Sequence, residues 1–336
     1  MGSTTSLHFD EFKMIKELLS PLSIGEVGAY GLSDDGAKIK VKNGDIILTT
    51  DAIIKGIHFP ESEDPKTIAS RIIRVNLSDI AAMGAVPRAY LLVLAIPSST
   101  TLSWMESFVE GLSCEQKEFG ISLIGGDTTR TQGELMLSIT MIGETYDNKV
   151  LLRNGASVGD YIYVSGFIGD ASLGLSLIEG RNKANSLSVT DYLINRFRKP
   201  TPRIDLGRNL TGIANSAADV SDGLLADLKH ICDASGVCAE IYLNHIPISS
   251  EAESMVSNNL NLRMDLLSGG DDYELIFTVP FKHISKVNEL SEKYNVQIKQ
   301  IGKIIGKGLN EDVITLKDVN GKTLKIASEG YQHFRN

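Results

Sequence analysis

Two hydrophobic periodicities alternate along the chain and predict a mixed α/β fold. Apolar residues three or four positions apart are typical of amphipathic helices, whereas short runs rich in Ile, Val and Leu are typical of buried strands. In the first half these patterns predict helices at 9–19, 65–83 and 102–119 and strands at 45–50, 88–96, 121–124 and 134–143. In the second half they predict strands at 160–164, 238–243, 273–279, 297–304 and 313–317, and helices at 171–179, 205–215, 222–234 and 281–294.

The chain length agrees with two domains of this kind. At about 150 residues per domain, a chain of 336 residues should form two. The first alternating series gives way to the second near residue 150. We therefore expect an N-terminal α/β domain at 1–150 and a C-terminal α/β domain at 151–336.

Composition and charge exclude several kinds of binding partner and cellular setting for this chain. The net charge of −9 argues against a nucleic-acid groove or a polybasic membrane surface. Three cysteines without a CxxC pair favour a reduced, cytoplasmic setting over a disulfide framework. The longest apolar run, 89–96, is far shorter than the roughly 18 residues of a membrane span. The first residues also lack the basic-then-apolar order of a secretory signal peptide.

Asp79 is the acid whose position is most informative. Its predicted helix is apolar on most faces, and Asp79 shares a stripe with Val75 and Met83, so we expect a largely buried carboxylate. A buried carboxylate without a partner is costly. Asp79 should therefore pair with Arg71 or Arg74, cap a neighbouring loop, or bind a metal or substrate. We favour the last of these.

Other aspartates follow hydrophobic segments in settings rich in Gly, Ser and Thr. Each alone is typical of a turn, but their number suggests a shared site at strand ends. They are Asp34, Asp35, Asp51, Asp127, Asp219, Asp222, Asp271 and Asp272. Converging carboxylates need cations to offset their repulsion, and oxygen ligands without His or Cys favour Mg²⁺. We therefore expect Mg²⁺-assisted phosphoryl transfer.

Two short patterns occur once in each half of the chain. Ser-Asp ends at Asp79 and again at Asp222, and Gly-Gly-Asp ends at Asp127 and again at Asp271, with nearly equal separations. This echo suggests related halves, or two halves that present acids to one site. Coincidence among common small residues is the alternative.

Phosphate binding has candidate residues but no familiar nucleotide motif. The glycine pairs at 125–126 and 269–270 let backbone N–H groups approach a phosphate. Arg153 carries a planar fork that suits a phosphate; an ordinary exposed loop arginine is the alternative. The sequence has no complete P-loop, no HRD or DFG set and no GxGxxG after a strand, so a nucleotide must be held in another way.

Four segments, in this order, resemble the thiamine-monophosphate kinase family of the aminoimidazole-ribonucleotide synthetase superfamily. They are VNLSDIAAMGA (75–85), LIGGDTTR (123–130), DVSDGLLADL (219–228) and SGGDDYEL (268–275). The resemblance implies a two-domain α/β (α+β) fold like that of aminoimidazole-ribonucleotide synthetase. It further implies that the N-terminal domain binds ATP and Mg²⁺ and that N-terminal sheets pair into a barrel across a homodimer. The implied activity is ATP- and Mg²⁺-dependent phosphorylation of thiamine monophosphate to thiamine diphosphate, the last step of thiamine diphosphate biosynthesis.

The resemblance also implies site residues. The implied metal ligands are Asp35, Thr49, Thr50, Asp51, Asp79, Asp127, Asp219 and Asp222. The implied ATP contacts are Gly126, Asp127, Arg153 and Ser221, and the implied substrate contacts are His58, Asp271 and Tyr331. No residue is assigned as a general acid or base, and Asp127 and Asp222 are the strongest candidates for metal-assisted catalysis.

Some positions depart from the family pattern or have plainer interpretations. Ser33 stands where the family usually has Gly, Thr49 where Ser is common, and Asp271 where Glu is common. Without the family, His58 would be interpreted as a partly exposed loop histidine and Tyr331 as an aromatic that packs the C-terminal tail.

The expected mechanism is direct in-line transfer from ATP. The second phosphate pKa is about 6, so the acceptor phosphate is already ionised near neutral pH and needs no strong base. Catalysis should then consist of positioning and charge neutralisation. Two alternatives stay open: a ring-forming ATP-dependent enzyme of the same superfamily, and a non-catalytic dimer that binds nucleotide and metal.

Overall fold

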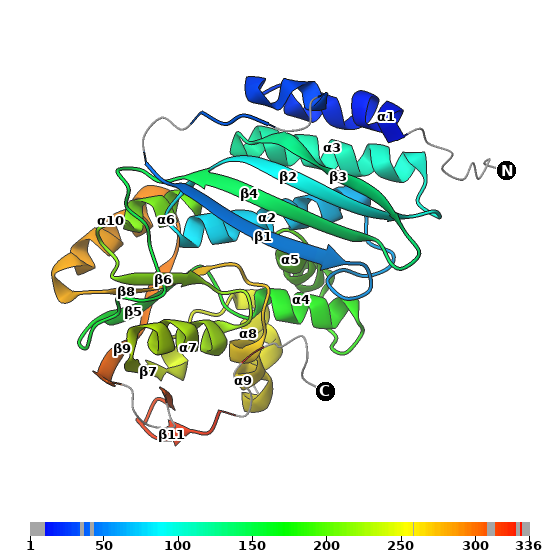
Figure 1. The fold of residues 1–336 in the computed structure, drawn as a ribbon. Helices are drawn as coiled ribbons and strands as arrows, with labels where there is room; N and C mark the ends of the chain where they lie inside the picture. The colour runs from blue at the N-terminus through cyan, green and yellow to red at the C-terminus, as the bar shows by residue number, and fades with distance from the viewer. Residues whose placement is uncertain are drawn as a thin grey trace. The chain divides into compact units, whose positions relative to one another are not determined.

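A computed structural model describes residues 11–33, 37–40, 44–257, 259–307, 313–326 and 330. The chain divides into two compact units (Figure 1). Unit 1 comprises Met1–Ile80 and Ala85–Asn148, and unit 2 comprises Ala81–Gly84 and Lys149–Asn336. Each unit contains helices and one β-sheet, so the mixed α/β fold that the sequence predicts is confirmed.

Unit 1 is built on a four-stranded sheet with the order β1-β4-β2-β3. Its strands are β1 (Ile46–Ile54), β2 (Val86–Pro97), β3 (Ser122–Thr131) and β4 (Met136–Glu144). Strand β4 runs antiparallel to β1 and β2, whereas β3 runs parallel to β2. Strands β1 and β3 are therefore the two edges of this sheet in the described part of the chain, and no closed barrel forms there.

Helices α2 (Pro65–Ala82) and α3 (Leu102–Phe119) pack on each other in unit 1. Asp64 accepts hydrogen bonds from the N–H groups of residues 66 and 67, which explains why α2 begins there. Gly111 allows the close approach of α3, since a Cβ at this position would lie 2.8 Å from Ala69 Cβ. Arg74 Nε of α2 lies 2.7 Å from Glu115 Oε2 of α3. Arg74, one of the two arginines considered as a partner of Asp79, thus forms an ion pair with Glu115.

The predicted helix at 9–19 is less regular than expected in its described part, 11–19. Its described part is α1 (Glu11–Met14) followed by a π-helical segment, Ile15–Leu19, and a 3₁₀ turn, Ser20–Ser23. A second 3₁₀ segment, Val27–Leu32, follows.

Unit 2 is built on a seven-stranded sheet with the order β11-β10-β7-β9-β5-β8-β6. The strands are β5 (Tyr161–Ser165), β6 (Ser216–Asp219), β7 (Val237–Tyr242), β8 (Leu275–Val279), β9 (Ile298–Lys307), β10 (Ile314–Lys317) and β11 (Thr323–Leu324). The helices are α4 (Asp170–Ile178), α5 (Leu187–Arg198), α6 (Ile204–Leu210), α7 (Leu224–Ser235), α8 (Ser250–Val256), α9 (Leu260–Ser268) and α10 (Ile284–Tyr294).

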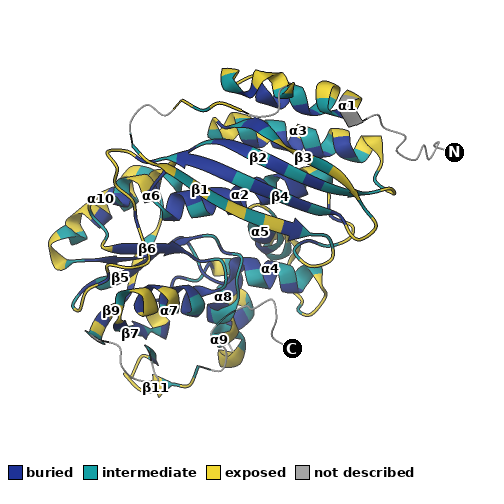
Figure 2. Cartoon of the chain, in the orientation of Figure 1, coloured by how far each residue is buried: buried dark blue, intermediate teal, exposed yellow. Residues whose placement is uncertain are grey.

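Several strands of unit 2, among them the interior strand β8 and the edge strand β6, are buried on both faces. Every residue of β8 and of β6 is buried, as is most of β5 (Figure 2). Such strands appear as continuous apolar runs rather than alternating patterns, which is why β8 was predictable from sequence. Strand β6 was not predicted, because its Ser-Ala-Ala-Asp sequence has little β-propensity.

Two predicted strands continue beyond the acids that were expected to follow them. Strand β1 extends to Ile54, which places Asp51 within the strand, and β3 extends to Thr131, which places Asp127 within it. Gly126 permits this extension, since a Cβ there would lie 1.8 Å from the Leu92 carbonyl oxygen of β2. The predicted turn after residue 124 is therefore wrong.

Among the described residues, no helix is both long and apolar enough to cross a membrane.

Candidate functional site

In unit 1, one face of β1 and helix α2 together position three candidate residues. Thr49 and Asp51 share a face of β1 because strand side chains alternate. Thr49 Oγ1 donates a hydrogen bond to Asp79 Oδ2 at 2.5 Å. The backbone N–H of Asp51 donates to Asn76 Oδ1 at 3.1 Å, and Asn76 is fully buried one turn before Asp79. These bonds hold a hydroxyl and two carboxylates close to one another.

The carboxylate of Asp79 is less buried than its helix pattern indicated. Asp79 is of intermediate exposure, while its neighbours Ser78 and Ile80 are fully buried. The reason is that Asp79 meets β1, an edge strand, whose own residues Thr49 and Asp51 are only half-buried. A half-buried carboxylate beside a strand edge is accessible to a ligand.

Thr50 and Asp127 lie on the opposite face of the unit 1 sheet. Thr50 Oγ1 donates to the Ile139 carbonyl of β4 at 3.0 Å, away from Thr49. Asp127 pairs in register with Val93, and Val93 pairs with Ser138, so these three residues share the face opposite to Asp51. Asp127 is also exposed on β3, the other edge of the sheet. Within one protomer the structure therefore does not bring Asp127 together with Thr49, Asp51 and Asp79.

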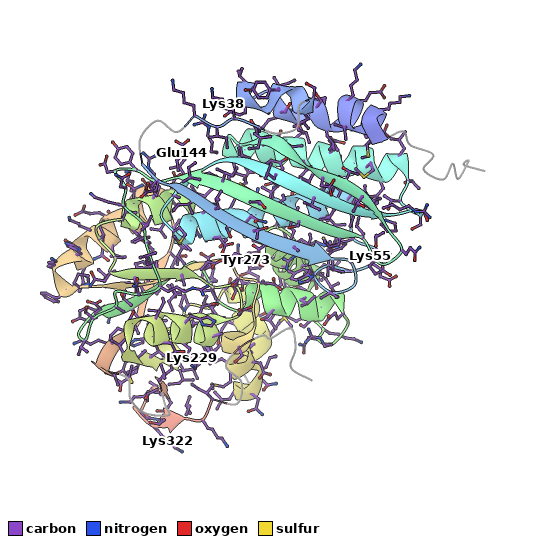
Figure 3. All side chains as sticks on the ribbon, viewed as in Figure 1. Lys38, Lys55, Glu144, Lys229, Tyr273 and Lys322 are labelled. Carbon is purple, nitrogen blue, oxygen red and sulfur yellow. The ribbon has the colours of Figure 1, made fainter. Side chains whose placement is uncertain are left out.

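In unit 2, two turns are joined by backbone hydrogen bonds. The N–H groups of Asp271 and Tyr273 donate to the carbonyls of Ser221 and Val220 at 2.9 and 2.8 Å. Asp271 and Tyr273 both have positive φ, 74° and 51°, which non-glycine residues adopt only when surrounding contacts impose it. Tyr273, which is labelled in Figure 3, donates from its hydroxyl to Asp271 Oδ1 at 3.3 Å. Ser221 and Asp271 are thus held side by side.

Asp219 and Asp222 belong to this pair of turns. Asp219 is the last residue of β6 and is 3% exposed, while Asp222 is half-buried in the turn that precedes α7. Asp227 lies on the first turn of α7 and accepts hydrogen bonds from the N–H groups of Ser221 and Asp222 at 3.0 and 3.1 Å. Burial, with the neighbouring charge of Asp222, raises the pKa of the Asp227 carboxyl to about 7.

Arg153 is an exposed loop residue of unit 2, and its carbonyl accepts a hydrogen bond from Ser235 Oγ at the end of α7. The positive charge of Arg153 lowers the pKa of the Asp227 carboxyl, but burial and the charge of Asp222 raise that pKa by more. The Arg153 backbone is therefore anchored at the end of α7, while its charge reaches Asp227 in the first turn of that helix.

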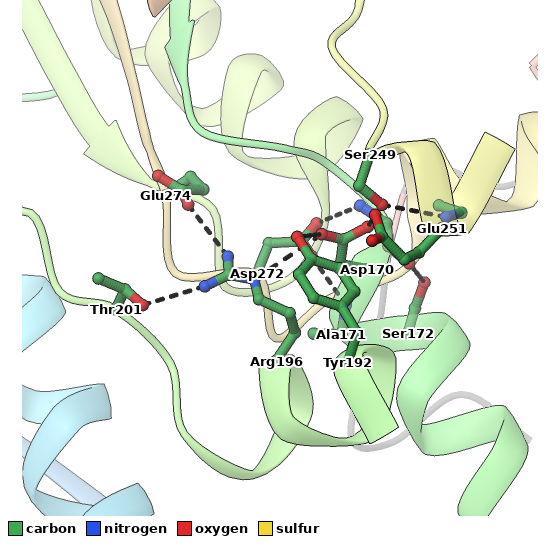
Figure 4. A network of polar contacts seen from close by, with 12 residues as sticks. Asp170, Ala171, Ser172, Tyr192, Arg196, Thr201, Ser249, Glu251, Asp272 and Glu274 are labelled. Carbon is green, nitrogen blue, oxygen red and sulfur yellow. Dashed lines mark hydrogen bonds and ion pairs between the residues drawn. The ribbon is translucent and has the colours of Figure 1, made fainter. Parts of the chain in front are cut away.

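A buried ionic network fixes the loop that carries Asp271 (Figure 4). Asp272, 1% exposed, accepts hydrogen bonds from the N–H groups of Gly169 and Ala171 at the start of α4. Glu274, fully buried, accepts from Ser165, Arg196 and Arg203 at 2.6, 3.0 and 2.6 Å. Asp271 therefore precedes two acids that are anchored in the interior, and its own position is set by them.

His58 terminates the hairpin-like turn after β1. Its Nδ1 accepts a hydrogen bond from the Ile54 backbone N–H at 3.0 Å, and the residue is half-buried. Nδ1 is the acceptor in this bond, which leaves Nε2 as the ring nitrogen that can carry a proton.

Asp35 and Tyr331 lie outside the described residues. The residue before Tyr331 is described: a Cβ at Gly330 would lie 2.8 Å from the Asp222 carbonyl oxygen. This part of the C-terminal segment therefore passes beside the turn that holds Asp222.

The internal echo does not correspond to matching local structures. Asp79 lies inside a helix, whereas Asp222 lies in a turn before one. Asp127 lies in a strand, whereas Asp271 lies in the loop before β8. The two units also have different sheets. The repeated motifs are thus similar in sequence but not in conformation.

Sequence reasoning did not select several residues that hold the candidate site. These are Asn76, Asp227 and Glu274. Asn76 and Asp227 carried a usable signal, because each is a polar residue on the apolar side of a predicted amphipathic helix. The role of Glu274 depends on arginines far away in the sequence, so no local pattern could reveal it.

Hard oxygen donors dominate both groups of residues. Thr49, Asp51 and Asp79 in unit 1, and Asp219 and Asp222 in unit 2, offer hydroxyl and carboxylate oxygens, the ligands that Mg²⁺ prefers. The donor set therefore fits Mg²⁺, and it supplies no sulfur ligand.

Known proteins resemble the chain over most of its length. Residues 33–145 match the N-terminal domain of the AIR synthase related protein family, and residues 157–314 match its C-terminal domain. The chain is 37% identical over 305 residues to thiamine-monophosphate kinase of Caulobacter vibrioides, with 89% of this chain and 86% of that protein covered.

Solved structures agree with these relatives. Thiamine-monophosphate kinase from Stenotrophomonas maltophilia is 36% identical, with a TM-score of 0.78, and the match covers 87% of this chain and 91% of that chain. A complex of AaThiL with AMPPCP and TMP is 29% identical, with a TM-score of 0.76 and coverage of 92% and 98%. With these identities and coverages, the chain belongs to the thiamine-monophosphate kinase family, with the two-domain α/β fold of AIR synthase related proteins.

Proposed function

We propose that the chain transfers the γ-phosphoryl group of ATP to thiamine monophosphate and so forms thiamine diphosphate, the last step of thiamine diphosphate biosynthesis. The observation that carries the proposal is the identity of more than a third with thiamine-monophosphate kinases across almost the whole chain. The AaThiL complex with AMPPCP and TMP supports the same pair of ligands. The joined turns around Ser221 and Asp271 provide a rigid part of the site.

Roles for individual residues follow from the motifs. Metal ligation is assigned to Asp35, Thr49, Thr50, Asp51, Asp79, Asp127, Asp219 and Asp222. Gly126, Asp127, Arg153 and Ser221 contact ATP, and His58, Asp271 and Tyr331 contact thiamine monophosphate. The N-terminal domain, 1–150, supplies most of the ATP- and Mg²⁺-binding groups and the dimer contact, and the C-terminal domain, 151–336, supplies the rest.

The reaction is an in-line displacement without a general base. A phosphate oxygen of thiamine monophosphate attacks the γ-phosphorus, and ADP leaves with the electron pair of the broken P–O bond. Mg²⁺ held by the carboxylates assigned above would supply charge neutralisation for the two anionic reactants. The protein's own contribution is positional: Arg153 clamps phosphate oxygens, and the loop at Asp271, fixed by Asp272 and Glu274, orients the acceptor.

Geometry within unit 1 supports a homodimer in which sheets pair into a barrel. Asp51 and Asp127 lie on the two edge strands of a four-stranded sheet, roughly 14 Å apart at the usual strand spacing, and on opposite faces. One cation cannot bridge them within a protomer. A second copy that places its β3 beside the first copy's β1 would put Asp51 and Asp127 on neighbouring strands across the dimer. Ile46 and Leu48 of β1, 42% and 64% exposed, provide apolar surface for such a contact.

The three cysteines are all free thiols, which supports the reducing, cytoplasmic setting expected from the sequence.

A parallel assay tests the proposed activity. ADP production from ATP and Mg²⁺ is measured with thiamine, thiamine monophosphate and aminoimidazole precursors as separate acceptors. Only thiamine monophosphate should raise it, and thiamine diphosphate should appear in equal amount. A response only to an aminoimidazole precursor would identify a ring-forming enzyme, and no response to any acceptor would favour a non-catalytic nucleotide-binding dimer.

A further inference from the structure

The first two turns of helix α7 and the loop before it bring together one nitrogen and two oxygen atoms that could bind a cation. One carboxylate oxygen of Asp222, one of Asp227 and a ring nitrogen of His230 all lie within 4.8 Å of one another. Asp227 and His230 are three residues apart on α7, so their side chains share one helix face. The cluster lies wholly within unit 2, and neither Asp227 nor His230 has a role in the proposed reaction.

The two carboxylate oxygens of Asp227 differ in their hydrogen bonding: within the described part of the chain, Oδ2 accepts hydrogen bonds and Oδ1 does not. The residue is 1% exposed, and its Oδ2 accepts from the N–H groups of Ser221 and Asp222. Its Oδ1 is buried and has no hydrogen-bond partner among the described residues. A buried carboxylate oxygen without a donor is costly, and a cation at this oxygen would remove that cost.

The positive side chains near this cluster do not take that place. His230 is exposed, and among the described residues it forms no ion pair or hydrogen bond with either acid. Lys229, the next residue, pairs with Asp233 at 2.7 Å. The Arg153 guanidinium attracts Asp227 only through its charge, since the described residues contain no ion pair between the two.

We propose that Asp222, Asp227 and His230 form a site for a divalent transition cation of the Mn²⁺ class. Mixed imidazole and carboxylate ligation suits such ions, whereas Mg²⁺ favours oxygen ligands and retained water. Asp222 is also one of the ligands assigned above to Mg²⁺. Asp227 adds a second carboxylate oxygen, and His230 adds a nitrogen ligand. A cation held here would lie beside the Ser221 turn and fix it from the helix side.

Two variants separate cation binding from folding. Asp227→Asn keeps an oxygen to accept from the Ser221 and Asp222 N–H groups and replaces the unpartnered oxygen with an amide NH₂, which cannot bind a cation. His230→Ala changes an exposed side chain. His245→Ala is the matched control, because His245 is also exposed and lies outside the cluster.

The experiment is a Mn²⁺ titration of the full chain without nucleotide, followed by electron paramagnetic resonance of the free ion and by melting temperature. Wild type and His245→Ala should bind one equivalent of Mn²⁺ that tenfold Mg²⁺ does not displace. Asp227→Asn and His230→Ala should lose this equivalent or bind it at least tenfold more weakly, with melting temperatures in metal-free buffer close to that of wild type.

A second readout observes the histidine directly. In ¹⁵N-labelled protein, the imidazole resonances of His230, assigned by their loss in His230→Ala, should broaden at substoichiometric Mn²⁺ before those of His245. Equal Mn²⁺ binding in wild type and His230→Ala, or full competition by Mg²⁺, would overturn the proposal. Because no measurement here uses thiamine monophosphate, failure of this site and failure of the proposed kinase activity are distinguishable.

Discussion

Thr49 on strand β1 donates a hydrogen bond to the Asp79 carboxylate on helix α2, across 30 residues of sequence. The Oγ1–Oδ2 distance of 2.5 Å is at the short end of the range for an O–H···O hydrogen bond. Thr49 is on the same face of β1 as Asp51. The bond from Thr49 to Asp79 therefore also sets how far the Asp79 carboxylate lies from Asp51, another candidate metal ligand. The hydroxyl is therefore a positioning group as well as a candidate ligand.

Removal of this hydroxyl should weaken catalysis without unfolding unit 1. Thr49→Val keeps the shape and loses the hydrogen bond, and we expect kcat/KM to fall by about 10- to 100-fold, as for other groups that orient metal ligands. Thr49→Ser keeps the hydroxyl and should stay within about threefold of wild type by the same reasoning. The measurement is kcat/KM against Mg²⁺ concentration, with the loss in Thr49→Val partly recovered at high Mg²⁺. Equal activity of the two variants would contradict the role of the hydroxyl.

Subunit mixing should restore activity to two inactive variants. If Asp51 of one protomer and Asp127 of another serve one site, then Asp51→Asn and Asp127→Asn are each inactive alone. After unfolding and joint refolding, half of the dimers are mixed and each holds one intact site, so activity should return to about a quarter of wild type in a symmetric two-site dimer.

The control for this experiment is a mixture of Asp51→Asn with Asp79→Asn. Asp51 and Asp79 are held by the same protomer's β1 and α2, so both sites of their mixed dimer stay defective. Recovery in this control, or no recovery in the mixture with Asp127→Asn, would show that Asp51 and Asp127 do not meet across the dimer.

Loss of the Glu274 charge should destabilise unit 2. Glu274 is fully buried between Arg196 and Arg203, whose side chains are 12% and 17% exposed. Glu274→Gln leaves both guanidinium groups without their shared counter-charge, and we expect the free energy of unfolding to fall by about 3–5 kcal/mol. Urea denaturation measures this change.

The matched control is the exposed ion pair of Arg181 with Glu179. Glu179→Gln should change the free energy of unfolding by less than about 1 kcal/mol, because exposed ion pairs are solvated in both states. Similar losses for Glu179→Gln and Glu274→Gln would mean that burial of the Glu274 network does not matter.

Asp170 should give the stability of the protein a distinctive pH dependence. Burial raises the pKa of Asp170 above its usual range, although Ser249, Arg196 and Tyr192 act in the opposite direction. A carboxyl with a raised folded-state pKa binds its proton more tightly when folded. Its stabilising effect is present below the unfolded pKa of about 4 and is lost as the pH rises through the folded value.

The test compares wild type with Asp170→Asn in urea at several pH values. The difference in free energy of unfolding, wild type minus variant, should fall as the pH is raised from about 4. In wild type Asp170 accepts from both Ser249 and Tyr192; the Asn side chain can still accept from Ser249, and its NH₂ can donate to the Tyr192 hydroxyl oxygen instead. A difference that is constant, or that grows with pH, would show that the ion pair with Arg196 outweighs burial.

Local patterns in the sequence determined most elements and the chemical class of the site. Helix α3 coincides with its prediction at 102–119, and Asp64 begins α2 as its capping residue type indicated. These features depend on hydrophobic periodicity and on hydrogen bonds between residues close in sequence. The same holds for the motifs around Asp79, Asp127, Asp222 and Asp271, which were sufficient to indicate the family.

Tertiary structure alone decided how those residues are presented. Whether Asp127 shares a sheet face with Asp51 depends on strand register and strand order, and both are set by pairing between distant segments. The short strand β6 exists because its small residues fit beside β8, although they do not favour a strand by themselves. Glu274 is stabilised by Arg196 and Arg203, more than 70 residues away. A local pattern carries no information about such partners, because the energies that place them arise only when distant segments pack together.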